Sequence, residues 1–181
     1  MIELVRQFRK RYPYWAWCTG AMLVWGCRVS ETFNLTPNTG DAFGTANIFG
    51  LKEEGAEVFE DRTALGKPEE LIEEFDLLNI DRPYYYNSSD QPYNPIKSKE
   101  FTDSWGKAFR RFLNQNAISG TTKFTKIKLY DIRHSYARRL IKLKLPTATA
   151  AKSMGNSEAI FTETYLKAMD KRDMAYIQKN I

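Results

Sequence analysis

Residues 14–34 have the sequence YWAWCTGAMLVWGCRVSETFN, and they decide the fold because they are apolar on most of their surface up to Trp25. A helix that is apolar on nearly all sides is buried, so the sequence predicts a core helix over 14–34. The end of this segment places Arg28 beside the apolar wall. A shorter helix is predicted over 2–11, before a Tyr-Pro break.

Outward from this helix, the pattern alternates between short strands and helices. Two strand-like runs, 46–52 and 56–65, flank Glu53-Glu54-Gly55 and predict a β-hairpin with the glycine in the turn. The segments 36–45, 81–95 and 119–128 are predicted as turns or loops. Further helices are predicted over 68–78, 99–116, 130–143, 147–154, 158–166 and 171–180. The sequence therefore predicts a mainly helical α+β domain with one small antiparallel sheet.

Composition excludes several classes of protein. An apolar content of 43% with 14% aromatics in 181 residues excludes wholesale disorder. The longest apolar stretch, 15–29, is too short and too polar to span a bilayer, and the basic N-terminus does not resemble a signal peptide. Two cysteines, Cys18 and Cys27, make no disulfide framework, and together with a single histidine they argue against a structural zinc site. We expect a cytoplasmic protein that needs no cofactor and no metal.

Charge is divided unevenly along the chain. Residues 1–90 hold 9 Lys or Arg and 15 Asp or Glu, whereas residues 91–181 hold 18 and 7. A one-sided basic surface is typical of proteins that bind a polyanion, although a solvated lysine-rich face gives the same count. The candidate contacts to double-stranded DNA are Lys97, Lys99, Lys107, Arg110, Arg111, Lys123, Lys126 and Lys128.

Three segments carry chemistry together: WGCRVSE at 25–31, LYDIRHSYA at 129–137, and MGNS at 154–157 followed by TETY at 162–165. Their order and spacing resemble the catalytic domain of the tyrosine recombinases, also called the phage integrase family. The resemblance covers roughly residues 14–170, and it rests on the combination because each motif alone is weak.

The resemblance implies a role for each motif residue. Arg28 and Arg133 would hold the scissile phosphate, since a guanidinium offers paired and permanently charged donors. Tyr165 would be the nucleophile that forms a 3′-phosphotyrosyl bond, which conserves the bond energy for rejoining. The alternative for Arg28 is a buried salt bridge to Glu31 or another acid.

The general acid for the leaving 5′ oxygen would be a lysine on the hairpin. Lys52 ends the first predicted strand and fits this position, and Lys67, which follows the second strand, is its rival. An ordinary solvated lysine is the alternative for either residue.

Two motif positions depart from the family pattern. Tyr130 stands where the family has its first histidine, and Asn156 stands where it has histidine or tryptophan. Both side chains can still donate hydrogen bonds to phosphate, but a tyrosine is a poor base at neutral pH. The Y-x-x-R form is similar to some cyanobacterial DNA-excision recombinases. His134 is expected to be structural, and an acid–base role beside Tyr130 is the alternative.

The resemblance predicts a site-specific DNA recombinase that acts in integration or excision, as a tetramer on DNA. Residues 1–181 would form a single catalytic domain without the family's N-terminal core-binding domain. Residues 166–181 would pack on a neighbouring protomer or fold back on their own chain. The alternatives are a DNA-binding module that has lost strand transfer, and a type IB topoisomerase-like relaxase.

Overall fold

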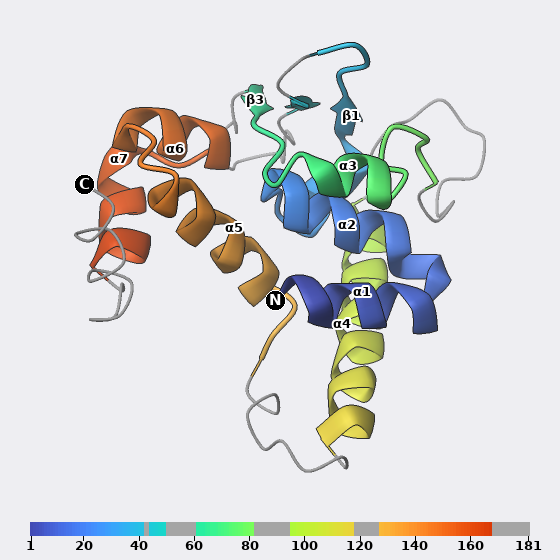
Figure 1. The fold of residues 1–181 in the computed structure, drawn as a ribbon. Coiled ribbons are helices and arrows are strands. Elements are labelled where there is room, and N and C mark those ends of the chain that lie inside the picture. The colour runs from blue at the N-terminus through green and yellow to red at the C-terminus, as the bar shows by residue number, and fades with distance from the viewer. Residues whose placement is uncertain (42–43, 50–60, 82–94, 118–126, 168–181) are drawn as a thin grey trace.

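The computed structural model describes residues 1–41, 44–49, 61–81, 95–117 and 127–167. Within these ranges the chain is mainly helical with one small antiparallel sheet, so the predicted α+β class is confirmed. Figure 1 shows the sheet above α2, with α1 and α4 below it and the C-terminal helices to one side.

The core is built around α2 (Ala16–Trp25), which follows α1 (Ile2–Arg11) and the 3₁₀ turn η1 (Pro13–Trp15). Every residue of α2 from Trp17 to Trp25 is buried, as its apolar surface predicts. In Figure 1, α2 lies between α1 on one side and the sheet on the other. It also packs against α5, and it therefore connects the two halves of the molecule.

The predicted core helix is wrong beyond Trp25. Gly26 adopts a left-handed conformation with φ of 61° and ends α2, and the chain continues through the 3₁₀ turn η2 (Ser30–Phe33). A Cβ atom at Gly26 would lie 2.1 Å from the ring of Tyr136. Only glycine combines this backbone angle with so close an approach, which is why the helix ends here.

The sheet has three strands, β1 (Leu35–Pro37), β2 (Ala46–Ile48) and β3 (Arg62–Ala64), in that order. In the register of this sheet, Asn47 pairs with Thr36 on one side and with Thr63 on the other. The predicted antiparallel pairing of the two runs is confirmed, and the turn predicted between them lies outside the described residues. The strand β1 falls partly in a segment predicted as turns, so that prediction is wrong there.

Two helices complete the N-terminal core. The short helix α3 (Glu70–Glu74) covers less than the predicted 68–78, and α4 (Pro95–Ala117) begins earlier than predicted. The large apolar side chains of α4 form a stripe that is buried against α1 and η1. This stripe comprises Phe101, Trp105, Phe109, Phe112 and Leu113.

The C-terminal elements pack around a second apolar cluster. They are α5 (Asp131–Lys142), α6 (Thr147–Met154), α7 (Glu158–Phe161) and the π-helical turn η3 (Thr162–Leu166). The predicted end of α6 at Gly155 is confirmed, since this glycine has a φ of 65°. The helix predicted over 158–166 changes to π-helical bonding halfway. The helix predicted over 171–180 lies outside the described residues.

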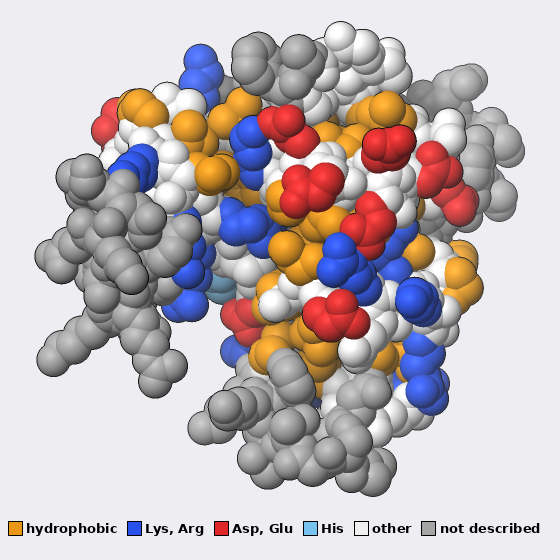
Figure 2. Space-filling view, in the orientation of Figure 1, with side chains coloured by type: hydrophobic (Ala, Val, Ile, Leu, Met, Phe, Trp, Pro, Cys, Tyr) orange, Lys and Arg blue, Asp and Glu red, His pale blue; other side chains and the backbone are white. Residues whose placement is uncertain are grey.

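Acidic and basic side chains gather on different parts of the surface, in agreement with their uneven distribution along the sequence. Figure 2 shows acidic side chains gathered over the region of α3, where Glu69, Glu70, Glu73 and Glu74 are exposed. Lys107, Arg110 and Arg111 are exposed on the opposite side of α4 from its apolar stripe. Among the helices that the structure describes, none has the length and apolar character needed to cross a membrane.

Candidate active site

A buried carboxylate, that of Glu31, contacts three arginines. Arg62 binds both of its oxygens, with Nη1–Oε1 at 2.9 Å and Nη2–Oε2 at 2.7 Å. Arg28 Nη1 lies 2.5 Å from Oε1, and Arg133 Nη1 lies 3.6 Å from Oε2. Three positive charges thus surround one negative charge in the protein interior. We call Arg28, Glu31, Arg62 and Arg133 the arginine cluster.

The electrostatics of Glu31 follow from these contacts. Burial by itself would raise the pKa of this carboxyl group. The hydrogen bonds and charge of Arg62, followed by the charges of Arg133 and Arg28, outweigh burial and hold the pKa at about 2. Glu31 is therefore ionised at neutral pH, and the cluster carries an excess of positive charge that suits an anionic ligand.

The position of Arg133 follows from the ends of two helices. It lies in the first turns of α5, and its guanidinium donates to the carbonyl of Gly26, just after α2, and to that of Met154, the last residue of α6. A cation is stabilised near helix C-termini, where carbonyl groups lack partners. Arg133 is fully buried, and its Nε has no hydrogen-bond partner among the described residues.

The turn after α6 brings Asn156 to both predicted phosphate-binding arginines. Its Oδ1 lies 3.4 Å from Nη2 of Arg133 and 3.5 Å from Nη2 of Arg28. The same Nη2 of Arg28 donates to the carbonyl of Gly155 at 3.2 Å. The left-handed conformation of Gly155 directs the chain back toward the cluster. Three predicted site residues, more than 120 positions apart at the extremes, therefore meet in space.

Tyr165 comes to the same place from the π-helical turn η3. In this turn, the amide of Lys167 donates to the carbonyl of Thr162, an interval of five residues. The Tyr165 side chain is buried, and burial raises the pKa of its phenol. The charge of Arg133 and hydrogen bonding to Arg133 and Asn156 act in the opposite direction. The phenol is thus protonated at rest and lies beside the groups that would stabilise its anion.

A cavity of about 780 Å³ opens onto this arrangement, and we call it the arginine cavity. Its lining includes Arg28, Arg62, Tyr130, Lys152, Asn156 and Tyr165. Four of the six predicted site residues therefore line one cavity. Arg133 is fully buried and is not part of the lining, but it contacts Asn156 in the wall of this cavity.

His134 lies between two tyrosine rings. Its ring centroid is 4.9 Å from that of Tyr130 and 5.4 Å from that of Tyr165. Burial, and after it the charges of Arg133 and Arg138, lower the pKa of His134, whereas Asp131 raises it. The imidazole is therefore neutral at pH 7. Its structural role stays a prediction.

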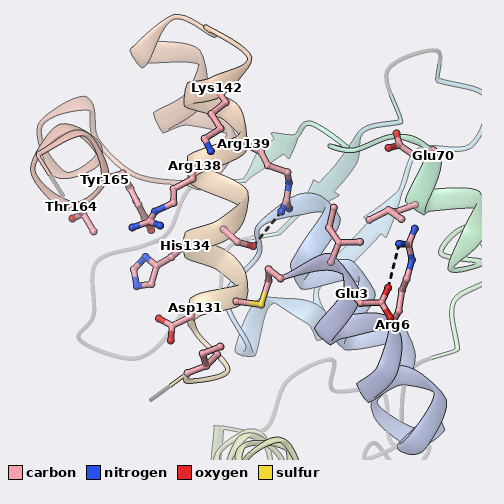
Figure 3. A pocket seen from close by; sticks show the side chains of 15 residues that line it. Glu3, Arg6, Glu70, Asp131, His134, Arg138, Arg139, Lys142, Thr164 and Tyr165 are labelled. Atoms are coloured by element: carbon pink, nitrogen blue, oxygen red, sulfur yellow. Dashed lines mark hydrogen bonds and ion pairs between the residues drawn. The ribbon is translucent and has the colours of Figure 1, made fainter. Parts of the chain in front are cut away.

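Tyr165 also closes a second cavity, of about 1000 Å³, which we call the α5 cavity. Figure 3 shows α5 crossing it, with Thr164 and Tyr165 on one side and Glu3 and Arg6 of α1 on the other. His134 and Arg138 project from α5 into the space near Tyr165. Thr164 and Tyr165 line both cavities, so this part of η3 forms a partition between them.

Neither of the two lysines predicted as the general acid is found in the arginine cavity among the described residues. Lys52 lies outside the described residues. Lys67 pairs with Glu69 and does not line the arginine cavity. Lys152 of α6 does line it, and the sequence reasoning did not single it out.

Arg62 is the residue of the cluster that sequence reasoning missed. One signal was available in the burial pattern of β3, in which Arg62 and Ala64 face inward and Thr63 faces outward. An inward-facing arginine on a strand requires a buried acid, and Glu31 lies in the motif already identified. Among the residues that the structure describes, no group of histidines, cysteines and carboxylates could hold a metal ion.

Comparison with known proteins shows a similarity to a curated protein. The chain is 30% identical over 179 residues to Excisase A of Nostoc sp. (strain PCC 7120), an alignment that covers 92% of this chain and 34% of that protein. The chain thus spans about a third of the length of this relative. No protein-family model matches the chain, and no solved structure matches it.

Proposed function

We propose that this chain is a DNA strand-transfer domain of the tyrosine recombinase type, which breaks and rejoins DNA through Tyr165. The carrying observation is that Arg28, Asn156 and Tyr165 line one cavity with Arg133 directly behind it. The similarity to a protein named Excisase A supports the coarser part of this proposal, a role in DNA excision or recombination.

The reaction proceeds by in-line displacement at phosphorus. The phenolic oxygen of Tyr165 forms a bond to the phosphorus atom as the bond to the 5′ oxygen breaks. The phenolic proton goes to water, and the 5′ oxygen receives a proton from Lys52, the general acid that the resemblance implies. Rejoining is the reverse reaction, with the 5′ hydroxyl as nucleophile and the tyrosine as leaving group.

The arginines act on the charge that gathers on the non-bridging oxygens. Arg28 is only partly buried and lines the arginine cavity, so a phosphate in this cavity can reach its guanidinium group. Arg133 is exposed to the phosphate when Tyr165 leaves its buried position to attack. The movement that aligns the nucleophile therefore also uncovers the second arginine, and DNA binding must drive it.

Double-stranded DNA is the proposed partner, with a tetramer on two duplexes as the assembly. The exposed Lys107, Arg110 and Arg111 would contact phosphates without reading sequence. The segment 166–181 is proposed to exchange between protomers, and residues 168–181 lie outside the described part of the chain. The protein is proposed to act in the cytoplasm.

A DNA-binding module without strand transfer is the second candidate. It is favoured by Tyr130 and Asn156, which replace the family's usual residues at two positions of the same cavity. A relaxase of the type IB topoisomerase kind would use the same covalent chemistry without exchanging partners. The three candidates differ in which products they form from DNA.

The test uses nicked suicide duplexes with a randomised core, labelled at one end and resolved on a denaturing gel with the protein. We expect a covalent adduct that persists in EDTA and disappears in Tyr165→Phe. Tyr14→Phe is the matched control, because this exposed tyrosine lines neither cavity. Binding without an adduct would favour the inactive module. Supercoil relaxation without recombinant duplexes would favour the relaxase.

A further inference from the structure

Arg62 directs its whole guanidinium group into the protein. It lies on β3 with a side chain only 4% exposed, and both of its terminal nitrogens bind Glu31. Its Nε donates to the carbonyl of Ser153 in α6 at 3.2 Å. A bidentate pair of this kind fixes orientation as well as distance. Arg62 therefore connects the sheet, η2 and α6 at a single point.

The two oxygens of Glu31 are shared between Arg62 and Arg28. Oε1 accepts from Nη1 of both arginines, and Oε2 accepts from Nη2 of Arg62 and from the backbone amide of Arg28. The hydrogen bonds of Arg62 are the largest influence that lowers the pKa of this carboxyl group. Without Arg62, Arg28 and Arg133 would be the cations left among the described residues to compensate the charge of the buried carboxylate, and it would bind them more strongly.

Arg62 also packs beneath the turn that carries Asn156. A Cβ atom at Gly155 would lie 2.8 Å from Cζ of Arg62, so the guanidinium fits against a position that has no side chain. The residue following this glycine is the one that contacts both predicted phosphate-binding arginines. Arg62 thus contacts the group that holds Arg28 and supports the turn that holds Asn156.

We propose that Arg62 is a positioning residue of the strand-transfer site, whose guanidinium compensates Glu31 so that Arg28 and Arg133 stay available to a phosphate. This inference rests on the proposed function for its chemistry. In this proposal Arg62 does not itself act on the phosphate, because all three of its nitrogens donate to groups of the protein, two to Glu31 and one to the carbonyl of Ser153. Its effect on the reaction passes through the carboxylate.

A double-mutant cycle tests this dependence, with the rate of adduct formation on the suicide duplexes as the readout. Arg62→Gln should slow the reaction on the order of 10- to 100-fold, as expected when a catalytic group is misplaced by about 1 Å. In the Glu31→Gln background the same change should have little effect, because no charge is left to draw Arg28 and Arg133 away. Equal slowing in both backgrounds would overturn the proposal and show a merely structural role.

A control separates this effect from loss of stability. Arg9 is a part-buried arginine that donates to backbone carbonyls of Ala16 and Phe75, far from the arginine cluster in the sequence and bonded to none of its members. Arg9→Gln should lower the thermal midpoint without the rate loss of Arg62→Gln. Arg62→Lys keeps the charge but lacks the fork, so we expect an intermediate rate.

A second readout does not depend on strand transfer. Inorganic phosphate should raise the thermal midpoint of the wild-type chain and should raise that of Arg62→Gln by a smaller amount. In the double variant, which carries Arg62→Gln and Glu31→Gln, phosphate should again raise the midpoint as much as in the wild type. If the wild type forms no adduct but this pattern holds, the proposed function fails and the role of Arg62 stands. If phosphate stabilises the wild type and Arg62→Gln equally, the role of Arg62 fails.

Discussion

The side-chain oxygen of Asn156, which lines the arginine cavity, lies 3.4 Å from Nη2 of the fully buried Arg133. The same oxygen approaches Nη2 of Arg28 at 3.5 Å. An uncharged acceptor therefore occupies the place between two guanidinium groups where an oxygen of a phosphate would bind. In the proposed function, Asn156 fills this place at rest and leaves it when the phosphate binds.

Asn156→Asp should lower the activity while the stability stays the same or rises. A carboxylate between Arg28 and Arg133 adds a charge-assisted pair, so we expect an unchanged or higher thermal midpoint. It also competes with phosphate, so adduct formation should fall on the order of 100-fold. Calorimetry and the suicide-duplex assay measure the two effects. Asn156→His, which restores a family residue, is the control and should keep the activity. Retained activity in Asn156→Asp would contradict this account of the site.

Glu31→Gln should destabilise the protein in a way that depends on pH. Removing the carboxylate leaves Arg62 buried without a charged partner, at a cost of about 3–5 kcal/mol near neutral pH. The pKa of Glu31 is lowered to about 2 in the folded state from an ordinary value of 4.5. A lowered folded-state pKa gives stability that is present above the unfolded value and is lost as the pH falls toward the folded one.

The difference in the free energy of unfolding between wild type and Glu31→Gln should therefore shrink as the pH falls from about 4.5 toward about 2. Urea unfolding curves at several pH values in this window measure it. Glu74 offers a control, because its carboxylate is exposed and pairs with Arg6 at the surface. Glu74→Gln should change the stability far less at neutral pH. A difference for Glu31→Gln that is constant with pH would contradict the assignment.

Gly155→Ala should have a larger effect on the protein than the strain of its positive φ alone explains. Both Gly155 and Gly40 have positive φ, 65° and 78°, and an alanine in such a conformation costs about 1 kcal/mol. A Cβ at Gly40 meets nothing within 4 Å, whereas at Gly155 it meets the guanidinium of Arg62. We expect Gly40→Ala to show the backbone cost alone and Gly155→Ala to add a loss of adduct formation. Equal behaviour of the two variants would show that Arg62 moves aside freely.

Tyr130→His should preserve or raise activity. The tyrosine is 41% exposed and lines the arginine cavity, so an imidazole fits there without disturbing the core. A histidine exchanges protons near neutral pH far better than a phenol does. The rate of adduct formation across pH measures the change, with Tyr130→Phe as the variant that removes the hydroxyl only. Complete loss in Tyr130→His would show that this tyrosine has a specialised role.

Local signals in the sequence were sufficient for the bounds of two helices, α1 and α6. The bounds of α1 and α6 match the predicted 2–11 and 147–154, because a Tyr-Pro break and a glycine end them. The end of α2 was misplaced because Gly26 is required by the ring of Tyr136, a contact across 110 positions that no local pattern shows. The strand β1 was missed because its three residues are defined only by pairing with β2.

The site residues that belong to sequence motifs could be predicted, whereas the residue that is defined by long-range packing could not. Arg28, Arg133, Asn156 and Tyr165 were assigned from the resemblance of their motifs to the tyrosine recombinases, and the structure brings them together. Arg62 was not found, because its importance depends on Glu31, which is 31 positions away and on a different element. Long-range pairs between buried charges leave little local trace in a sequence, apart from an inward-facing charge on a strand.

The π-helical turn that carries Tyr165 has a consequence for how this chain can vary. A residue in an α-helix turns about 100° from its predecessor, so a return to α-helical bonding at Thr162–Leu166 would rotate the phenol around the helix axis by a comparable angle. Whether the tyrosine faces the arginines is thus determined by main-chain geometry. A variant of this chain with one residue deleted from this segment could keep every motif residue and still have its tyrosine side chain directed toward solvent.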